Sequence, residues 1–274
     1  FRLAAKMAAD SDAAILFMGI STDIETEGKD RTEIGLPGVQ QELLEAVYKA
    51  NPNIVLVLNN GRPLVLTWAT QNIPAIVEAW HLGTQSGNAI AQVIYGDYNP
   101  SGKLPMTFPR SVGQIPIYYN YKNTGRPSMN EPGSVFWSHY TDELNTPLYP
   151  FGYGLSYSKF EYSNLKLSNA SFSKGGNITV TVTVKNTGKF TGKEVVQLYI
   201  RDLVGSLTRP VKELKGFELI ELKPGAQKEV VFVINEKTIE YYTANNKWEG
   251  EPGDFKVFVG TNSSETMEAD FKFE

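Results

Sequence analysis

The sequence predicts an α/β doubly wound domain with a mostly parallel sheet (an α/β sandwich), followed by an all-β sandwich. Three observations support this prediction. Apolar runs alternate with helical patterns through residues 1–95, as expected for a parallel sheet covered by helices. From residue 160 the helical pattern disappears, and short strand-like runs recur between Gly, Pro and Asn residues. The chain has 274 residues, which is enough for two domains of ordinary size.

The first half supplies short buried strands and the helices that connect them. Helices are expected over residues 1–12, 37–50 and 84–95, and strands over residues 13–19, 54–58 and 75–80. The run IVLVL at residues 54–58 is continuously apolar, which is typical of a parallel strand covered on both faces. Because the chain opens inside a helical pattern, without a start methionine or a signal peptide, we expect it to begin within a longer protein.

The second half reads as antiparallel strands. Residues 178–184 (ITVTVTV) alternate strictly, which predicts a strand with one buried face. Further strands are expected over residues 195–200, 230–234, 255–259 and 267–273, with turns at residues 222–225 and 251–254. Several short strands over about 115 residues favour a sandwich of immunoglobulin or fibronectin type III shape. We therefore predict an α/β domain over residues 1–158, with a long loop at 109–147, and a fibronectin type III-like sandwich over residues 159–274.

Composition argues against several classes of function. A net charge of −4 does not favour a nucleic-acid binder, which needs a clustered basic face. No window approaches the ~18 apolar residues that a membrane span requires. The chain has no cysteine and two histidines, so we expect no metal site. A complete G-x-G-x-x-G motif and a G-x-S-x-G elbow are both missing, so neither a dinucleotide cofactor nor α/β-hydrolase chemistry is expected.

An acidic loop follows the first predicted strand. Residues 21–40 read STDIETEGKDRTEIGLPGVQ. They contain five carboxylates: Asp23, Glu25, Glu27, Asp30 and Glu33. Ligands of open α/β sheets bind outside the carboxyl ends of the strands, so one of these carboxylates is a candidate general acid/base. The alternative is a solvated acidic loop. Glycoside hydrolysis is the main class of chemistry that uses two carboxylates alone.

The long loop at residues 109–147 is the second candidate region. A loop of this length inside a compact domain is usually functional or packed over a site. Its aromatic residues, among them Trp137 and Tyr140, suit stacking on the faces of sugar rings. The alternative is that these rings only anchor the loop onto the sheet.

Seven stretches carry a resemblance to a known family. They are EGKDRTEIGLPGVQQELL (27–44), VLNNGRPL (57–64), GNAIAQVIYGDYNPSGKLPMTFPRSVGQIPIYY (87–119), NTGRP (123–127), LYPFGYGLSYSKFEYS (148–163), RPVKELKGFE (209–218) and PGDFKVFVGT (252–261). In this order they resemble the C-terminal part of family three glycoside hydrolases, most nearly the bacterial periplasmic β-glucosidases. The likeness covers nearly the whole chain.

The resemblance implies a fold order and a mechanism. Family members carry a TIM-like barrel, an α/β sandwich domain and a fibronectin type III-like domain, and this chain looks like the second and third. They are retaining exo-glycosidases with a barrel aspartate as nucleophile and a glutamate of the sandwich domain as acid/base. That glutamate precedes the family's Arg-Thr element, here at residues 31–37, by four positions, which lands on Glu27. Glu25 is the second candidate. Without the barrel, we expect the chain to fold but not to turn over substrate.

The resemblance also suggests secondary roles. Trp137, Tyr140 and Asp142 lie where the family's variable loop borders the leaving-group subsite. Asp30 and Arg31 are expected to be structural and to hold the acidic loop through an ion pair. Arg62, in the turn after the second strand, is expected to be a buried partner of that loop rather than a catalytic group.

The implied partners are β-glucosides or β-linked gluco-oligosaccharides and the N-terminal barrel of the same protein, in the bacterial periplasm or outside the cell. No cofactor, metal, nucleic acid or membrane partner is expected, and a homodimer stays open. Two alternatives remain. One is a non-catalytic carbohydrate-binding or scaffold module, and the other is a neighbouring specificity, such as a β-xylosidase or, less in keeping with the domain order, a β-N-acetylglucosaminidase.

Overall fold

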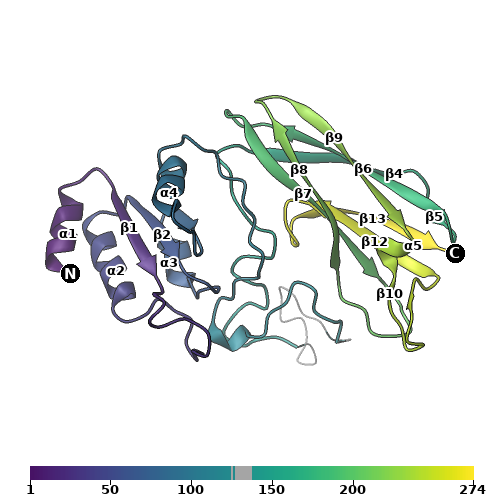
Figure 1. Ribbon diagram of the computed structural model, residues 1–274, viewed down its shortest axis with the longest axis horizontal. Helices are drawn as coiled ribbons and strands as arrows, with labels where there is room; N and C mark the ends of the chain where they lie inside the picture. The colour runs from purple at the N-terminus through teal and green to yellow at the C-terminus, as the bar shows by residue number, and fades with distance from the viewer. Residues whose placement is uncertain (125, 127–137) are drawn as a thin grey trace. The chain divides into compact units, whose positions relative to one another are not determined.

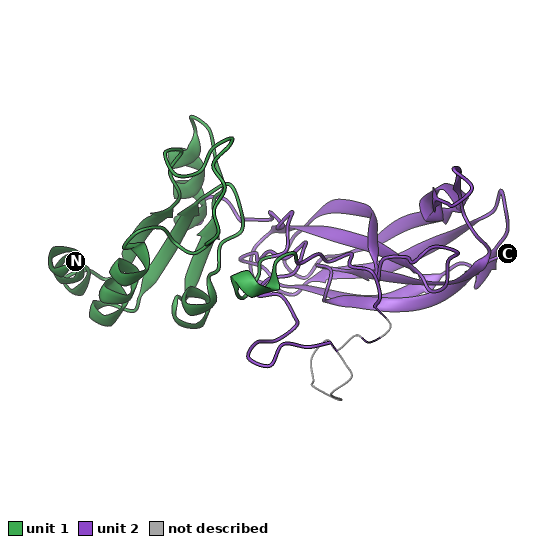
Figure 2. Cartoon of the chain, turned by 90° about the horizontal axis from the view of Figure 1, so that it is seen from below, with its two compact units in different colours: residues 1–95, 108–116 green, residues 96–107, 117–274 purple. Residues whose placement is uncertain are grey.

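The computed structural model describes residues 1–124, 126 and 138–274. Its contacts divide the chain into two compact units, which Figure 2 shows in different colours. The first unit comprises Phe1–Tyr95 and Phe108–Pro116, and the second comprises Gly96–Thr107 and Ile117–Glu274. Each unit has its own hydrophobic core.

The first unit contains a three-stranded parallel sheet in the order β1-β2-β3 (Figure 1). Its strands are β1 (Ala14–Gly19), β2 (Ile54–Asn59) and β3 (Ala75–Glu78), and its helices are α1 (Arg2–Ala9), α2 (Gln40–Ala50), α3 (Thr67–Asn72) and α4 (Ser86–Ile94). The strands are in register, so that Phe17, Val57 and Val77 lie side by side.

Both faces of the central strand are covered. Successive side chains of a strand point to opposite faces, and Leu56, Val57 and Leu58 of β2 are all 0% exposed. On one face, Ile90 and Ile94 of α4 pack against the row that includes Val57. This parallel sheet between helices confirms the predicted α/β class of the first half.

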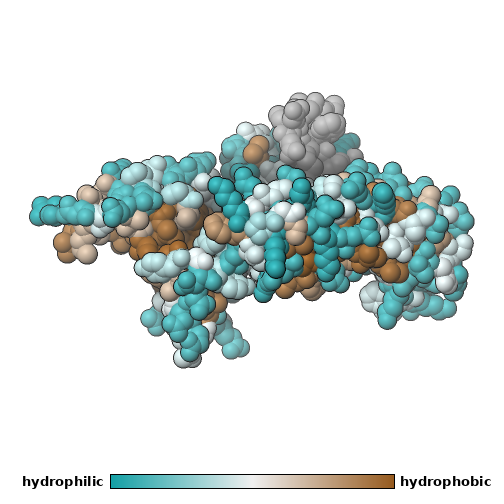
Figure 3. Space-filling view, turned by 90° about the horizontal axis from the view of Figure 1, so that it is seen from above, coloured by the Kyte–Doolittle hydropathy of each residue, from teal (hydrophilic) through white to brown (hydrophobic). Residues whose placement is uncertain are grey.

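The edge strand β1 is less well covered. Ile15 and Phe17 lie on the same face as Val57 but remain exposed. In α1, Leu3 and Met7 are exposed as well. Figure 3 shows hydrophobic side chains reaching the surface of both units.

Strand β3 ends at Glu78, two residues earlier than the apolar pattern predicts. Trp80 instead adopts a left-handed conformation with φ of 50°. Its backbone N–H donates to the Glu78 carboxylate at 3.1 Å, which bends the chain away from the strand direction. The Trp80 ring then packs edge-on against Phe108 within the same unit.

The second unit contains a sandwich of a five-stranded and a three-stranded sheet. The five-stranded sheet has the order β5-β13-β12-β7-β8 and the three-stranded sheet the order β4-β6-β9. The strands are β4 (Phe160–Leu167), β5 (Ser171–Phe172), β6 (Asn177–Asn186), β7 (Gly192–Asp202), β8 (Glu213–Leu222), β9 (Gln227–Asn235), β12 (Gly253–Gly260) and β13 (Thr266–Phe273), with α5 (Glu236–Ile239) and the hairpin of β10 (Tyr241–Tyr242) and β11 (Trp248–Glu249) beside them. Alternate residues of β6 and β7 build the core between the sheets, which confirms the predicted all-β sandwich.

The outward face of β7 is covered by chain that precedes the sandwich in sequence. Tyr119 stacks on Phe151 at a centroid distance of 4.2 Å and meets Tyr199 of β7 edge-on at 5.9 Å. Gln197 of β7 donates to the carbonyl of Gly152 at 3.1 Å. These contacts explain why residues 96–107 and 117–158 cluster with the sandwich, whereas the sequence predicts a domain boundary after residue 158.

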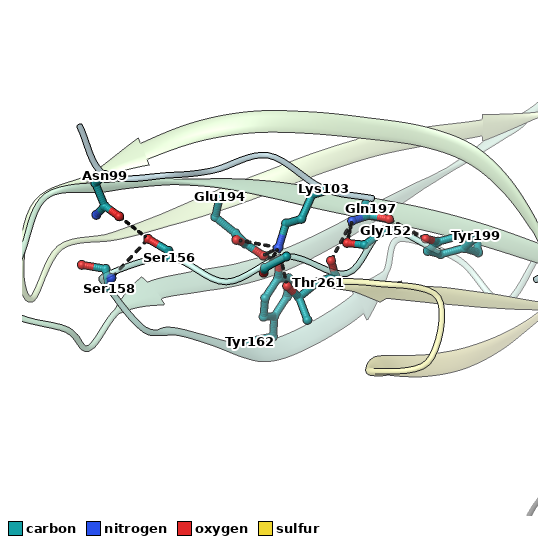
Figure 4. A network of polar contacts seen from close by, with 11 residues as sticks. Asn99, Lys103, Gly152, Ser156, Ser158, Tyr162, Glu194, Gln197, Tyr199 and Thr261 are labelled. Carbon is teal, nitrogen blue, oxygen red and sulfur yellow. Dashed lines mark hydrogen bonds and ion pairs between the residues drawn. The ribbon is translucent and has the colours of Figure 1, made fainter. Parts of the chain in front are cut away.

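A buried ion pair holds one of these covering segments in place. Lys103 lies 3.2 Å from Glu194 of β7, and their side chains are 10% and 4% exposed (Figure 4). Lys103 also donates to the Thr261 hydroxyl at 2.8 Å, and the Tyr162 hydroxyl donates to Glu194 at 2.8 Å. Each charge is therefore paired and hydrogen-bonded, which is the condition under which charges are tolerated inside a protein.

Where the structure describes it, the long loop at residues 109–147 contains a short 3-10 helix, Val112–Gln114, and an isolated antiparallel bridge between Lys122 and Pro210. Among the described residues, no helix has both the length and the hydropathy that a membrane-spanning helix requires.

Candidate functional site

Polar residues gather at the carboxyl edge of the parallel sheet in the first unit. The acidic loop leaves β1, the turn Asn60-Gly61-Arg62 leaves β2, and Glu78 ends β3. Because the strands are parallel, all three exits lie at the same edge. This is the edge at which open α/β sheets bind their ligands.

The acidic loop is fixed at the point where it leaves the sheet. Gly19 has φ of 137°, and a Cβ there would lie 2.1 Å from the Asn59 carbonyl oxygen, so no larger residue fits. The Gln40 carboxamide accepts from the Gly19 N–H and donates to the Gly19 carbonyl, both at 2.8 Å. At the far end of the loop, the Val65 N–H donates to the Ile34 carbonyl at 3.0 Å. Both ends of the loop are thus tied to the fold.

Glu25 turns back from the loop onto the turn that follows β2. Its Oε1 accepts a hydrogen bond from Arg62 Nε at 2.7 Å, and its side chain is 9% exposed. The other oxygen, Oε2, is buried and has no hydrogen-bond partner. The Glu25 N–H donates to the Ser21 carbonyl at 3.0 Å, so the backbone at this position is held as well.

The turn that carries Arg62 is also connected to β3. Asn60 is 0% exposed, and its Nδ2 donates to the Arg62 carbonyl at 2.9 Å and to Glu78 Oε2 at 3.4 Å. Burial raises the pKa of the Glu78 carboxyl to about 7, and the hydrogen bonds from Trp80 and Asn60 oppose this shift without cancelling it. One polar network therefore runs from the acidic loop through the β2 turn to the end of β3.

Gly61 allows two side chains to approach this turn closely. A Cβ at Gly61 would lie 3.0 Å from His81 Nε2 and 3.2 Å from Glu25 Oε1. The exposed His81 and the buried Glu25 carboxylate thus lie against the same glycine.

Glu27 lies in the exposed turn two residues after Glu25. The turn is closed by the Lys29 N–H, which donates to the Thr26 carbonyl at 3.0 Å, and by Lys29 Nζ, which donates to the Asp23 carbonyl at 2.6 Å. Gly28 supplies the left-handed conformation, with φ of 75°. Glu27 is exposed, and among the described residues no hydrogen bond or ion pair involves its carboxylate.

The predicted ion pair between Asp30 and Arg31 is not found within the described part of the chain. Arg31 Nη2 donates instead to the Gly35 carbonyl at 3.2 Å, while Asp30 is exposed. Adjacent side chains in an extended loop diverge, so Arg31 turns toward the backbone that follows it. Arg31 still fastens the loop, through a carbonyl rather than through a carboxylate.

The residues predicted to border the leaving-group subsite belong to the second unit. The Tyr140 N–H donates to Asn145 Oδ1 at 3.0 Å within a local turn, and both Tyr140 and Asp142 are exposed. Trp137 lies outside the described residues. No group of three or more His, Asp or Glu side chains arranged to hold a metal ion is found among the residues that are described.

Sequence reasoning did not single out Glu78. One signal was available, since Glu78 is a lone carboxylate inside the otherwise apolar run AIVEAW. A charged side chain in such a run is seldom buried unless it has a polar partner, so Glu78 was a candidate for a buried polar contact.

Comparisons with known proteins agree with this architecture. The family model described as glycosyl hydrolase family 3 C-terminal domain matches residues 1–157, and that of the fibronectin type III-like domain matches residues 194–263. A periplasmic beta-glucosidase of Salmonella typhimurium is 46% identical over 98% of this chain and 35% of its own length. A beta-xylosidase of Formosa agariphila is 45% identical over 96% of this chain and 35% of its own length.

Solved structures give the same result. The beta-glucosidase of Listeria innocua in complex with glucose superposes with a TM-score of 0.93 at 38% identity, over 98% of this chain and 37% of that one. A D270A mutant of the same enzyme, in complex with laminaribiose, also has a TM-score of 0.93. The chain thus spans about a third of the length of the curated relatives that it matches.

Proposed function

Because this chain belongs to glycosyl hydrolase family 3, we propose that it supplies the general acid/base of a retaining, exo-acting β-glucosidase. In this proposal Glu27 is the acid/base. The nucleophile is an aspartate of an N-terminal barrel, which corresponds to the part of the relatives that this chain does not span.

The contrast between Glu25 and Glu27 supports the assignment. A general acid must come within about 2.6–3.2 Å of the glycosidic oxygen, so its carboxyl group has to be accessible. Glu25 is nearly buried and bound to Arg62, whereas Glu27 is exposed at the carboxyl edge of the sheet, in a loop that is fixed at both ends. A retaining mechanism also needs a second carboxyl group about 5–5.5 Å away, which the barrel would provide. We therefore expect the chain alone to be inactive.

β-Glucosides and β-linked gluco-oligosaccharides are the substrates we propose. The Listeria innocua relative has been crystallised with glucose and, as a mutant, with laminaribiose. A β-xylosidase is the second candidate, because one relative of nearly equal identity carries that name. The periplasmic relative favours a periplasmic or secreted protein.

A chimera tests the proposal directly. In it, this chain replaces the matching C-terminal part of the Salmonella typhimurium β-glucosidase, which then contributes the barrel. We expect the chimera to hydrolyse aryl β-glucosides and the isolated chain not to do so. Matched aryl β-xylosides, assayed in parallel, decide between the two specificities.

The leaving group provides the decisive readout for Glu27. In the chimera, Glu27→Gln should lower kcat/KM for phenyl β-glucoside by about 10²–10⁴-fold, the usual contribution of a general acid. It should lower kcat/KM much less for dinitrophenyl β-glucoside, whose phenolate departs without a proton. The parameter kcat/KM reports the step in which the leaving group departs, whereas kcat also includes the later attack of water, for which Glu27 is the general base. Asp23→Asn, which changes an exposed carboxylate of the same loop, is the control. Equal losses on both substrates, or turnover by the isolated chain, would contradict the proposal. A folded chimera that binds glucose without turnover would support the alternative of a binding module.

A further inference from the structure

The ion pair between Glu25 and Arg62 joins two segments that are 37 residues apart in sequence. Burying a carboxylate costs free energy unless a charge and hydrogen bonds compensate it. Here one oxygen of Glu25 is compensated and the other is not. An exposed acidic loop has no need of a carboxylate folded inward at this cost. The arrangement indicates that Glu25 holds the loop at a specific place.

The anchor on the other side of the pair is rigid. The Arg62 carbonyl is held by the fully buried Asn60, which also contacts Glu78 at the end of β3. Arg62 is therefore fixed to the ends of two adjacent strands. Sites supported on strand ends are held more accurately than sites supported by loops alone.

Glu27 is close enough to Glu25 to be positioned by it. Two residues of chain span at most about 7 Å, so fixing the Glu25 backbone confines Glu27 to a small region. The other bonds of the turn, from Lys29 to Asp23 and Thr26, are internal to the loop and cannot fix it relative to the sheet. A misplacement of about 1 Å can cost 10²-fold in rate, so such confinement matters for proton transfer.

We propose that Glu25 and Arg62 form a positioning pair that holds the Glu27 loop against the end of β2. This inference rests on the proposed role of Glu27 as the acid/base. Glu25 is a positioning residue and not a catalytic residue, because its carboxylate is committed to Arg62 and faces inward. This role of Glu25 differs from the one that the sequence suggested, in which Glu25 was the second candidate for the acid/base.

The test uses the chimera and the same pair of substrates. Glu25→Ala and Arg62→Ala should each lower kcat/KM for phenyl β-glucoside by about 10–100-fold, with at most a few-fold loss of kcat/KM for dinitrophenyl β-glucoside. Because both changes remove the same interaction, the double variant should lose no more activity than either single variant. Glu25→Gln keeps a hydrogen-bond acceptor for Arg62 and should fall between wild type and Glu25→Ala. Asp23→Ala is the matched control for loss of a loop carboxylate.

The outcomes separate the two proposals. If Glu27→Gln shows the leaving-group dependence and Glu25→Ala lowers both substrates equally or not at all, the positioning role is wrong and the role of Glu27 stands. If Glu27→Gln shows no such dependence, the proposed function itself fails. A purely structural role of Glu25 would lower both rates together.

Amide hydrogen exchange on the isolated chain gives a readout that needs no chimera. In Glu25→Ala, exchange at the amides of residues 24–29 should become at least several-fold faster, because the loop loses its attachment to β2. Exchange in β2 should stay unchanged, which shows that the sheet is intact, and Asp23→Ala should resemble wild type. Unchanged protection of the loop in Glu25→Ala would overturn the proposal.

Discussion

Glu78 is a single residue whose ionisation is coupled to folding. Its carboxyl group is the end point of the polar network at the sheet edge, and burial raises its pKa to about 7. In the unfolded chain the same group has a pKa near 4.5. At a pH between these two pKa values, Glu78 keeps its proton in the folded state and has released it in the unfolded state.

The sign of the resulting pH dependence follows from proton linkage. Stability falls with rising pH wherever the folded state binds more protons than the unfolded state. We therefore expect the contribution of Glu78 to decrease stability as the pH rises from about 4.5 to 7, by about 3 kcal/mol at most. Glu78→Gln should remove this dependence and raise the urea midpoint at pH 8 relative to wild type. Urea unfolding at pH 5 and pH 8, followed by tryptophan fluorescence, measures the effect.

An exposed carboxylate provides the control for Glu78. Glu33 lies in the acidic loop and is exposed, so Glu33→Gln should leave the difference between pH 5 and pH 8 as in wild type. A Glu78→Gln variant that keeps the wild-type pH dependence would show that other groups produce it.

At the residue scale, the sequence predicted where polar groups gather but not which of them bind one another. The acidic loop and Arg62 were identified because they follow strands. The pairing of Arg62 with Glu25 could not be predicted, since five carboxylates lie within eleven residues and a pattern does not say which of them folds inward. Arg31 donates to the backbone carbonyl of Gly35, and a sequence pattern does not show that a carbonyl competes with the carboxylate of Asp30 for this side chain.

At the element scale, strands with one buried face were the most predictable. β6, β7, β9, β12 and β13 all contain the runs expected from alternation, because their inward side chains fill one core. β8 (Glu213–Leu222) was not expected. It is an edge strand whose Phe217 and Leu219 are exposed, so its apolar residues do not mark an inward face.

A buried ion pair, Lys103 with Glu194, is one of the contacts that attach β7 to the chain that covers it. Lys103→Met should leave Glu194 buried without a cation and destabilise the second unit by about 3–5 kcal/mol. Lys193, which lies in β7 next to Glu194, pairs with Glu221 at the surface, where the two side chains are 40% and 61% exposed. Lys193→Met should therefore cost less than about 1 kcal/mol. Urea unfolding of both variants tests the comparison, and equal effects would show that the burial of Lys103 does not matter.

At the scale of the whole molecule, the sequence predicted two domains, and the structure shows two compact units divided elsewhere. Composition changes at residue 160, where the strands begin, so a boundary near 158 was the natural prediction. Contacts made by irregular chain, such as Tyr119 on Phe151, leave no periodic pattern and were not predictable.

Truncation distinguishes the two divisions. A fragment of residues 159–274 would lose Lys103 and Phe151 and would expose Tyr199, which is fully buried in the whole chain. We expect this fragment to unfold at lower urea concentration than a fragment of residues 96–274, or to aggregate. Equal urea midpoints for the two fragments would instead support a domain that begins at residue 159.

The contact between Lys103 and Thr261 also has a consequence during synthesis. The two residues are 158 positions apart, and ribosomes add about 5–20 residues per second, so Lys103 is made roughly 8–30 s before its partner. Through this interval the segment around Lys103 has no sandwich to cover. The second unit can complete its fold only after nearly the last residues of this sequence have left the ribosome. In a cell, the segment around Lys103 would be exposed to chaperones and proteases for longer than the strands on which it finally rests.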